Sequence, residues 1–184
     1  VPNFHAEQAL KGWQNVVEAT HETPAKIGPQ LWHVGMMRQP GTGPEPDAAS
    51  DSPSGRTHTG SQVQPEPTES EVADMVMAYA NAAGDAARLG FDCVEIHGAH
   101  GYLIDEFFWG VMNTRADQYG GGLVGRAKFA GEVIAECRAQ VGEDMPIILR
   151  WSQWKQQDFS ARLAETPAEL EAFLKVFVDA GVDV

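Results

Sequence analysis

The sequence predicts an α/β fold with parallel strands, arranged either as a stretch of a TIM-type (β/α)8 barrel or as a doubly wound sheet. Amphipathic helical segments alternate with short apolar runs, which are typical of buried parallel strands. Two junctions repeat one another, because Leu89-Gly90-Phe91-Asp92 and Ala180-Gly181-Val182-Asp183 each leave a helix and enter a strand. Such repeated junctions indicate β-α-β units with crossover helices.

The N-terminal segment predicts a helix over residues 5–22. Its apolar residues recur mostly at three- and four-residue spacing: Ala9, Leu10, Trp13, Val16, Val17 and Ala19. Residues 26–34 then have strand character. The pair Gly28-Pro29 is unfavourable in a central strand, so we expect only part of this run to be a strand.

Three further helices have defined ends. Segments 68–89 and 166–181 begin with a capping box, in which a Thr precedes a Glu by three residues: Thr68 with Glu71, and Thr166 with Glu169. A third helix is expected from about Leu123 to Val141. A glycine stands at the end of each helix, as the left-handed cap requires: Gly90, Gly142 and Gly181.

Four strands are therefore expected, in 26–34, 91–96, 146–150 and 182–184, and the last stops after three residues. A complete barrel has eight. We therefore expect an incomplete barrel if the fold is of that class.

Residues 40–67 are rich in Pro, Gly, Ser, Thr and Asp and show no periodicity. A connection of this length inside a compact domain is usually functional or disordered. The sequence gives equal support to a lid over an active site and to a mobile insertion.

Composition excludes several classes of partner. The chain has 184 residues, enough for one domain, and a net charge of −13, which repels phosphate backbones and argues against nucleic acid. No apolar run approaches the roughly 18 to 20 residues of a membrane span. The start lacks both Met and the features of a signal peptide, so we expect it to lie inside a longer chain. Cys93 and Cys137 are predicted to be buried thiols of a reducing, cytoplasmic protein.

Polar and aromatic residues gather where three of the predicted strands end. In parallel α/β folds these ends lie on one side of the sheet, where chemistry collects. We therefore expect the following residues to share one mouth: Gln30, Trp32 and His33; His97, His100 and Tyr102; Arg150 and Trp151.

His97 and His100 have three interpretations. They could be satisfied polar residues, a metal-binding pair, or two donors that hold a substrate oxygen. No Asp, Glu or Cys stands at a compatible spacing, so a metal is disfavoured. Tyr102 is either a proton donor or an aromatic residue of the core with an exposed hydroxyl.

Four stretches, in order and at matching spacing, resemble the old yellow enzyme family of flavin-dependent ene-reductases: Gln30–Gly35, Gly90–Phe107, Asn113–Gly121 with Arg126 after it, and Pro146–Arg150. The resemblance covers almost the whole chain apart from the long loop. It implies that residues 1–184 form a single incomplete barrel domain, roughly strands 3 to 6 with their helices.

Carried over by position, the resemblance implies two flavin contacts, Gln30 and Arg150. It also implies a substrate site formed by four residues: Trp32, His97, His100 and Tyr102. The two imidazoles would hold the carbonyl oxygen, the tyrosine would protonate the alkene, and the tryptophan would line the pocket. Donors aimed at the oxygen stabilise the negative charge that develops there.

The implied activity is reduction of α,β-unsaturated carbonyl compounds by NAD(P)H, with FMN as cofactor and ping-pong hydride transfer. The partner is a small molecule, and an assembly of identical chains is compatible with this activity. Three alternatives stay open: a dienoyl-CoA reductase, an amine dehydrogenase, or a non-catalytic fragment.

Overall fold

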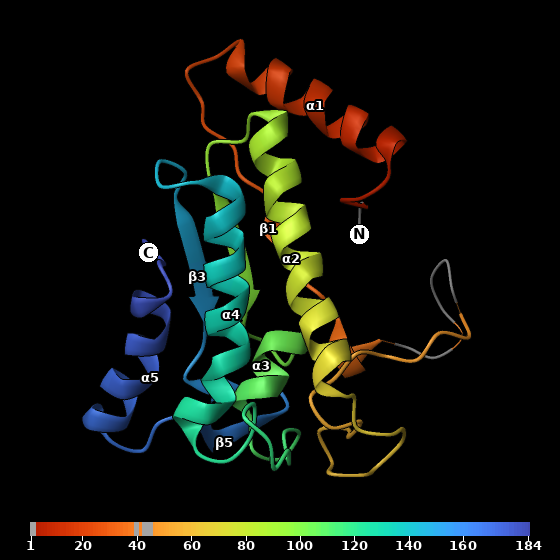
Figure 1. The fold of residues 1–184 in the computed structure, drawn as a ribbon, viewed down its shortest axis with the longest axis vertical. Coiled ribbons are helices and arrows are strands. Elements are labelled where there is room, and N and C mark those ends of the chain that lie inside the picture. The colour runs from red at the N-terminus through yellow and green to blue at the C-terminus, as the bar shows by residue number, and fades with distance from the viewer. Residues whose placement is uncertain (1–2, 39–40, 42–45) are drawn as a thin grey trace.

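The computed structural model describes residues 3–38, 41 and 46–184. Its centre is a three-stranded parallel sheet in the order β1 (Gln30–Leu31), β2 (Val94–Gly98) and β3 (Ile147–Trp151). Helices α2 (Glu69–Leu89) and α4 (Leu123–Val141) connect successive strands and lie side by side (Figure 1). The predicted parallel α/β fold is confirmed, and the sheet does not close into a barrel within the described residues.

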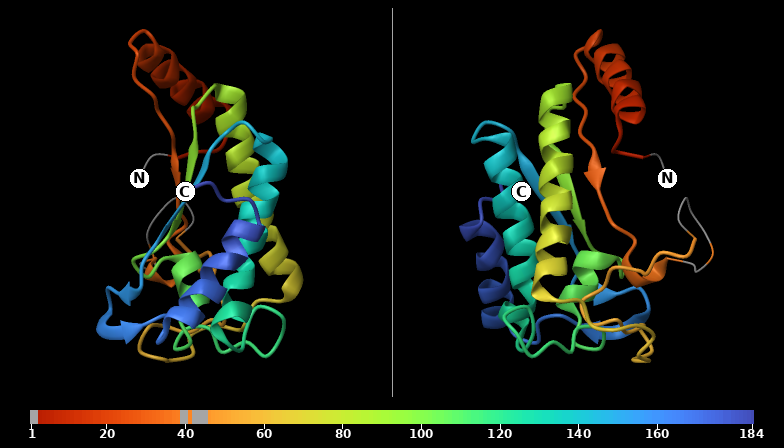
Figure 2. Two further views of the ribbon diagram at one scale, coloured as in Figure 1. Left: turned by 90° about the vertical axis from the view of Figure 1, so that its left-hand side faces the viewer. Right: turned by 45° about the vertical axis from the view of Figure 1, so that its right-hand side comes forward.

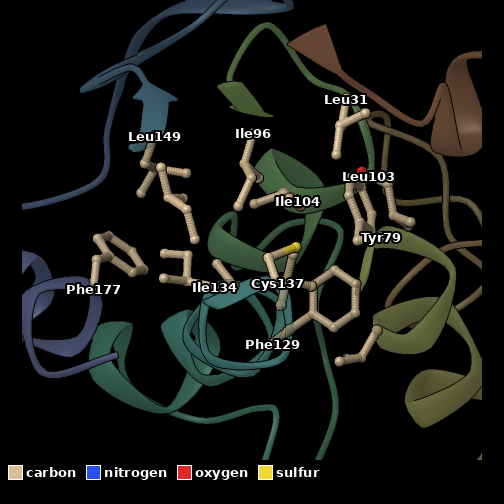
Figure 3. Close-up of a cluster of buried hydrophobic side chains, with 14 of the residues drawn as sticks. Leu31, Tyr79, Ile96, Leu103, Ile104, Phe129, Ile134, Cys137, Leu149 and Phe177 are labelled. Carbon is tan, nitrogen blue, oxygen red and sulfur yellow. The ribbon is translucent and has the colours of Figure 1, made fainter. Parts of the chain in front are cut away.

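The two faces of the sheet differ in what covers them. The register pairs Leu31 with Ile96 and Ile96 with Leu149, and all three side chains are buried. They meet buried residues of α2 and α4 in one core, with Tyr79, Ile134 and Cys137 among them (Figure 3). No helix among the described residues covers the opposite face, and the left view of Figure 2 shows the sheet edge-on. We call this uncovered side of the sheet the open face.

The predicted helix ends agree with the structure. Both capping boxes are present, at Thr68 for α2 and at Thr166 for α5 (Pro167–Asp179). Gly90 has φ 83° and Gly142 has φ 77°, a region that glycine enters without steric cost. Helix α1 (Glu7–His21) also lies where the periodicity placed it, although no side chain caps its start.

The strands are shorter than their apolar runs. Of the expected strand in 26–34, only β1 forms. Before β1 the chain makes only isolated hydrogen bonds to the β2 segment, such as the one that the Glu95 amide donates to Pro29 O at 3.0 Å. β2 begins three residues later than expected, because Asp92 is bonded there to the segment that precedes β1. Its carboxylate accepts hydrogen bonds from the Lys26 ammonium at 2.8 Å and from the Ile27 amide at 2.9 Å.

The C-terminal run 182–184 is not assigned as a strand but lies beside β3. The Asp183 amide donates to Ile147 O at 2.9 Å, and the Leu149 amide donates to Val184 O at 2.8 Å. These bonds extend the sheet in the predicted direction.

Four short elements were not predicted. A 3-10 turn, η1 (Gly35–Met37), follows β1, and the short helix α3 (Leu103–Phe108) follows β2. The antiparallel hairpin of β4 (Trp154–Lys155) and β5 (Asp158–Arg162) follows β3. Each lies in the connection that follows a strand, at the end of the sheet where the site was expected.

The long loop is only partly described, since residues 39, 40 and 42–45 lie outside the described residues. Its later part is attached to the segment after α3. The Arg115 guanidinium donates to Pro53 O at 2.8 Å and to Pro67 O at 2.7 Å, and the Thr114 amide donates to Ser54 Oγ at 2.9 Å. Ser54 is buried. This part of the loop is therefore packed against the domain.

The two cysteines differ. Cys137 is buried in the core, and burial raises the pKa of its thiol to about 12. The prediction is wrong for Cys93, which is only partly buried. It stands two residues before Glu95, on the open face, where its sulfur occupies the space that a side chain at Gly28 would need. No helix among the described residues is long and apolar enough to cross a membrane.

Candidate functional site

Alternate residues of the strands carry the polar side chains of the open face. β1 contributes Gln30, β2 contributes Glu95 and His97, and β3 contributes Arg150. Successive side chains of a strand point to opposite faces, so these residues are interleaved with the core residues between them. The same three strands thus supply side chains to the core on one face and to the candidate site on the other.

Four rings gather where β1 and β2 end. The Trp32 and Tyr102 ring centroids lie 4.4 Å apart, those of His97 and Tyr102 lie 5.5 Å apart, and those of His97 and His100 lie 5.0 Å apart. Trp32 follows β1, His97 belongs to β2, and His100 and Tyr102 follow β2. The structure therefore brings together the four residues that were predicted to form a substrate site. We call Trp32, His97, His100 and Tyr102 the ring cluster.

His97 is the most buried member of the ring cluster, at 4% exposure. Burial lowers the pKa of its imidazole, and the nearby His100 and Arg150 lower it further. At neutral pH the ring is therefore uncharged, with one N–H and one lone pair. Its buried Nδ1 has no hydrogen-bond partner among the described residues. An unpaired buried polar atom of this kind is costly unless a ligand satisfies it.

His100 has φ 64°, a left-handed conformation that is uncommon for a residue with a side chain. The next residue, Gly101, has φ 79°. The Gly101 amide donates to Asp105 Oδ2 of α3 at 2.8 Å, which ties this turn to the helix behind it. The two left-handed residues reverse the chain so that the second imidazole returns toward the first.

Gln30 and Arg150, the predicted flavin contacts, both lie on the open face. Gln30 is exposed, and its side-chain amide donates to the Glu95 carboxylate. Arg150 pairs with His97 in the strand register and is exposed. Its guanidinium makes no ion pair with any residue that the structure describes. A positive charge thus remains available beside the ring cluster.

Two of the residues expected at the mouth point elsewhere. His33 Nε2 lies 3.1 Å from a carboxylate oxygen of Asp51 in the long loop, and its Nδ1 accepts a hydrogen bond from the Gly35 amide at 3.1 Å. The Trp151 ring packs against Phe173 of α5 at 5.5 Å, on the helical side. Residues that follow one another along a strand cannot all face one mouth, and these two have the opposite orientation.

One aromatic pair near the site was missed. Trp154 in β4 lies 6.2 Å from the His100 ring, and Phe159 in β5 stacks on Trp154 at 5.6 Å. Both side chains are exposed. The segment was not predicted to be a hairpin, so its aromatic residues were not assigned to the site.

A cavity of about 530 Å³ lies beside this region rather than within it. It opens between the N-terminal segment, the free edge of β1 and α2, and it shares Gln30 and Trp32 with the candidate site. Within the described parts of the chain, no group of three or more His, Cys, Asp or Glu side chains could hold a metal ion.

The comparisons with known proteins agree with this geometry. The model of the NADH:flavin oxidoreductase / NADH oxidase family matches residues 1–183. The chain belongs to this family, that of old yellow enzyme. The match spans nearly every residue, so the ring cluster and the open face both lie within it.

Named relatives give the same result. The chain is 38% identical over 151 residues to flavin oxidoreductase hxnT of Emericella nidulans, which covers 78% of this chain and 39% of that protein. It is also 38% identical over 152 residues to putative 12-oxophytodienoate reductase 2 of Oryza sativa, with 77% and 39% covered. Old Yellow Enzyme from Pichia sp. AKU4542 superposes with a TM-score of 0.81 and 30% identity, over 94% of this chain and 47% of that one.

The chain therefore spans about two fifths to half the length of the family members that it matches. The predicted partial barrel is confirmed, since the parallel strands and helices correspond to part of a solved family structure. The open face of the sheet is the side that a complete barrel encloses.

Proposed function

We propose that this chain forms the central part of an FMN-dependent NAD(P)H oxidoreductase that reduces the C=C bond of α,β-unsaturated carbonyl compounds. One observation carries the proposal: the ring cluster joins two imidazoles and a phenol where β1 and β2 end, beside an arginine that makes no ion pair with any described residue. The reductase and flavin oxidoreductase names of the relatives support the same class of reaction.

The residues of the open face are suited to a flavin ring. Arg150 offers a cation that has no carboxylate partner within the described residues, and Gln30 offers an amide. Arg150 and Gln30 would hold the polar edge of the ring. When bound, the flavin supplies the hydride chemistry that no protein side chain can supply.

The chain's own residues act on the substrate. His97 and His100 each donate one N–H to the carbonyl oxygen, which gains negative charge as the C=C bond is reduced. Donors that are already in place stabilise this charge without reorganising. The Tyr102 phenol donates its proton to the α-carbon as a general acid. Trp32 stacks near Tyr102 and lines the pocket.

A phenolate titration of the flavin-loaded, full-length protein that contains this chain tests the proposal. A phenolate places its anionic oxygen between the two imidazoles and its electron-rich ring over the oxidised flavin, so we expect a long-wavelength charge-transfer band. Each imidazole contributes a charge-assisted hydrogen bond of about 1.5–3 kcal/mol. His97→Ala and His100→Ala should each weaken binding by roughly ten- to a hundredfold.

Turnover assays complete the test. The protein should oxidise NADH or NADPH in the presence of an α,β-unsaturated ketone such as cyclohexenone, and a chelator should not inhibit it. Unchanged phenolate affinity in both His variants would contradict the oxygen-binding role. Flavin binding without any turnover would favour a non-catalytic, ligand-binding role.

A further inference from the structure

Helix α3 lies at the centre of the connections that surround the ring cluster. All six of its residues are buried, including the adjacent acids Asp105 and Glu106. Glu106 Oε1 accepts a hydrogen bond from the Met36 amide in η1 at 2.7 Å. Asp105 faces the other two connections. The helix therefore contacts the chain segments that follow all three strands.

Asp105 uses its two oxygens in different ways. Oδ2 accepts the Gly101 amide at 2.8 Å, and Oδ1 accepts a hydrogen bond from the Lys155 ammonium of β4. Both members of this ion pair are 0–1% exposed. Burial raises the pKa of Asp105 and lowers that of Lys155, while the attraction between them opposes both changes. The β4–β5 hairpin is thereby joined to the turn that carries His100.

A second contact joins the same two segments. Gln157 Nε2 lies 3.4 Å from His100 O, and a Cβ on Gly101 would stand 1.8 Å from that nitrogen. The end of the Gln157 side chain therefore packs against the peptide between His100 and Gly101. Lys155 is thus connected to the left-handed turn through Asp105, and Gln157 contacts the turn directly.

The His100 ring has little other support. Its neighbours are the rings of His97 at 5.0 Å and Trp154 at 6.2 Å, and no residue in the described part of the chain hydrogen-bonds to it. Its orientation therefore depends on its backbone, which holds a conformation that is rare for a non-glycine residue. Such a conformation persists only where the surrounding structure enforces it.

Stability alone does not account for the buried ion pair. Two ions taken out of water lose hydration that their attraction often fails to restore, and apolar residues of similar volume commonly stabilise a protein equally well. The pair does provide directional bonds to two segments at once. These bonds fix the hairpin relative to the turn, which a nonpolar contact would do less strictly.

We propose that Asp105 and Lys155 are positioning residues, whose buried ion pair holds the His100–Gly101 turn so that the imidazoles of His100 and His97 reach the same substrate oxygen. The inference rests on the proposed function, because it assigns the pair to the oxygen-binding step. Neither residue is assigned a contact with substrate.

The test is a phenolate titration of the flavin-loaded, full-length protein carrying Lys155→Met, alone and combined with each His→Ala change. We expect Lys155→Met to weaken binding about tenfold, because the His100 donor is displaced rather than removed. In the His100→Ala background Lys155→Met should cause no further loss of phenolate affinity. In the His97→Ala background Lys155→Met should still weaken phenolate binding about tenfold. The effects of two substitutions add when the residues act independently, and they do not add when one residue acts through the other.

Asp117→Asn is the matched control. It disrupts the ion pair between Asp117 and the buried Arg115, which holds the long loop and not the His100 turn. It should lower the midpoint of urea unfolding without changing phenolate affinity.

A combined Asp105→Asn and Lys155→Met variant addresses failure to fold. It leaves no unpaired buried charge, and its Asn oxygen can still accept the Gly101 amide. It should fold and still bind phenolate about tenfold more weakly. Affinity equal to the parent protein in this variant, or an equal loss from Lys155→Met in every background, would overturn the positioning role. Loss of the His100→Ala effect itself would instead refute the proposed function.

Discussion

The Tyr102 ring lies 4.4 Å from Trp32 and 5.5 Å from His97, so the phenol stands between a residue that follows β1 and a residue of β2. Tyr102 is also the residue immediately before α3, where its carbonyl accepts the Glu106 amide at 2.8 Å. The side chain is thus directed toward the site by the helix that begins behind it.

This placement predicts a selective defect when Tyr102→Phe is made in the flavin-loaded, full-length protein. A general acid contributes roughly 100- to 10,000-fold, and a proton is needed only when the alkene is reduced. Stopped-flow should show alkene reduction slowed by that range and flavin reduction by NAD(P)H almost unchanged. Tyr119→Phe is the control, because its hydroxyl donates to Glu132 at 2.8 Å and lies outside the ring cluster. Equal slowing of both half-reactions in Tyr102→Phe would indicate a structural role.

Arg150→Met should weaken FMN binding and lower the flavin reduction potential. The substitution removes a positive charge from the open face, where it would stabilise the negative charge that the ring gains on reduction. If one charge-assisted contact is lost, the potential should fall by about 30 to 60 mV for two electrons. Potentiometric titration measures the change, with Lys11→Met on exposed α1 as the control. A potential and an FMN affinity equal to those of the parent would remove Arg150 from the cofactor site.

Glu106→Gln should stabilise the protein increasingly as pH rises. Burial, the nearby Asp105 and Asp51 raise the pKa of Glu106 from an ordinary 4.5 to about 9, while the Met36 amide opposes the change. Between these values the folded chain holds a proton that the unfolded chain has lost, so stability falls with rising pH. The fall is up to about 1.4 kcal/mol per pH unit for one group.

Urea denaturation at pH 5, 7 and 9 tests this dependence. The difference between Glu106→Gln and the parent should be smallest at pH 5 and largest at pH 9, while exposed Glu143→Gln should show none. A difference that does not vary with pH would mean that Glu106 is ionised in the folded protein.

The 184-residue chain on its own should fold poorly and bind FMN weakly. In the part of the chain that the structure describes, no helix covers the open face and no strand pairs with the free edge of β1, and an unpaired strand edge promotes association between chains. Size-exclusion chromatography should show aggregates. A monodisperse yellow protein with a cooperative thermal transition would contradict this expectation.

The four longer helices, α1, α2, α4 and α5, were predictable because their signals are local. The Thr68 box and Gly90 define both ends of α2 within a few residues of sequence. Strand lengths were less predictable, because the length of β1 depends on which of its residues pair with β2 and not on the apolar character of the segment. The β4–β5 hairpin is a further case: its ends meet across an irregular register, and Lys155 is buried only because Asp105, fifty positions earlier, neutralises it.

The ring cluster was predictable for a related reason. Trp32, His97, His100 and Tyr102 all stand at strand ends, and parallel strands bring such ends together whatever lies between them in sequence. Alternation along the chain is enough to turn His33 and Trp151 away from the ring cluster. Their partners there, Asp51 and Phe173, could not be predicted. Neither partner is adjacent in sequence or marked by a motif.

The interleaving of core and site along β2 constrains how this protein can change. Substitution of His97 alters the open face and leaves Ile96 in the core, so point mutations can vary the chemistry without unfolding the chain. Deletion or insertion of a single residue within β2 would instead exchange the residues that face the core with those on the open face, turning Ile96 outward and an imidazole inward. Diversification of this strand should therefore proceed by replacement, and length variation should be confined to the segments that follow the strands.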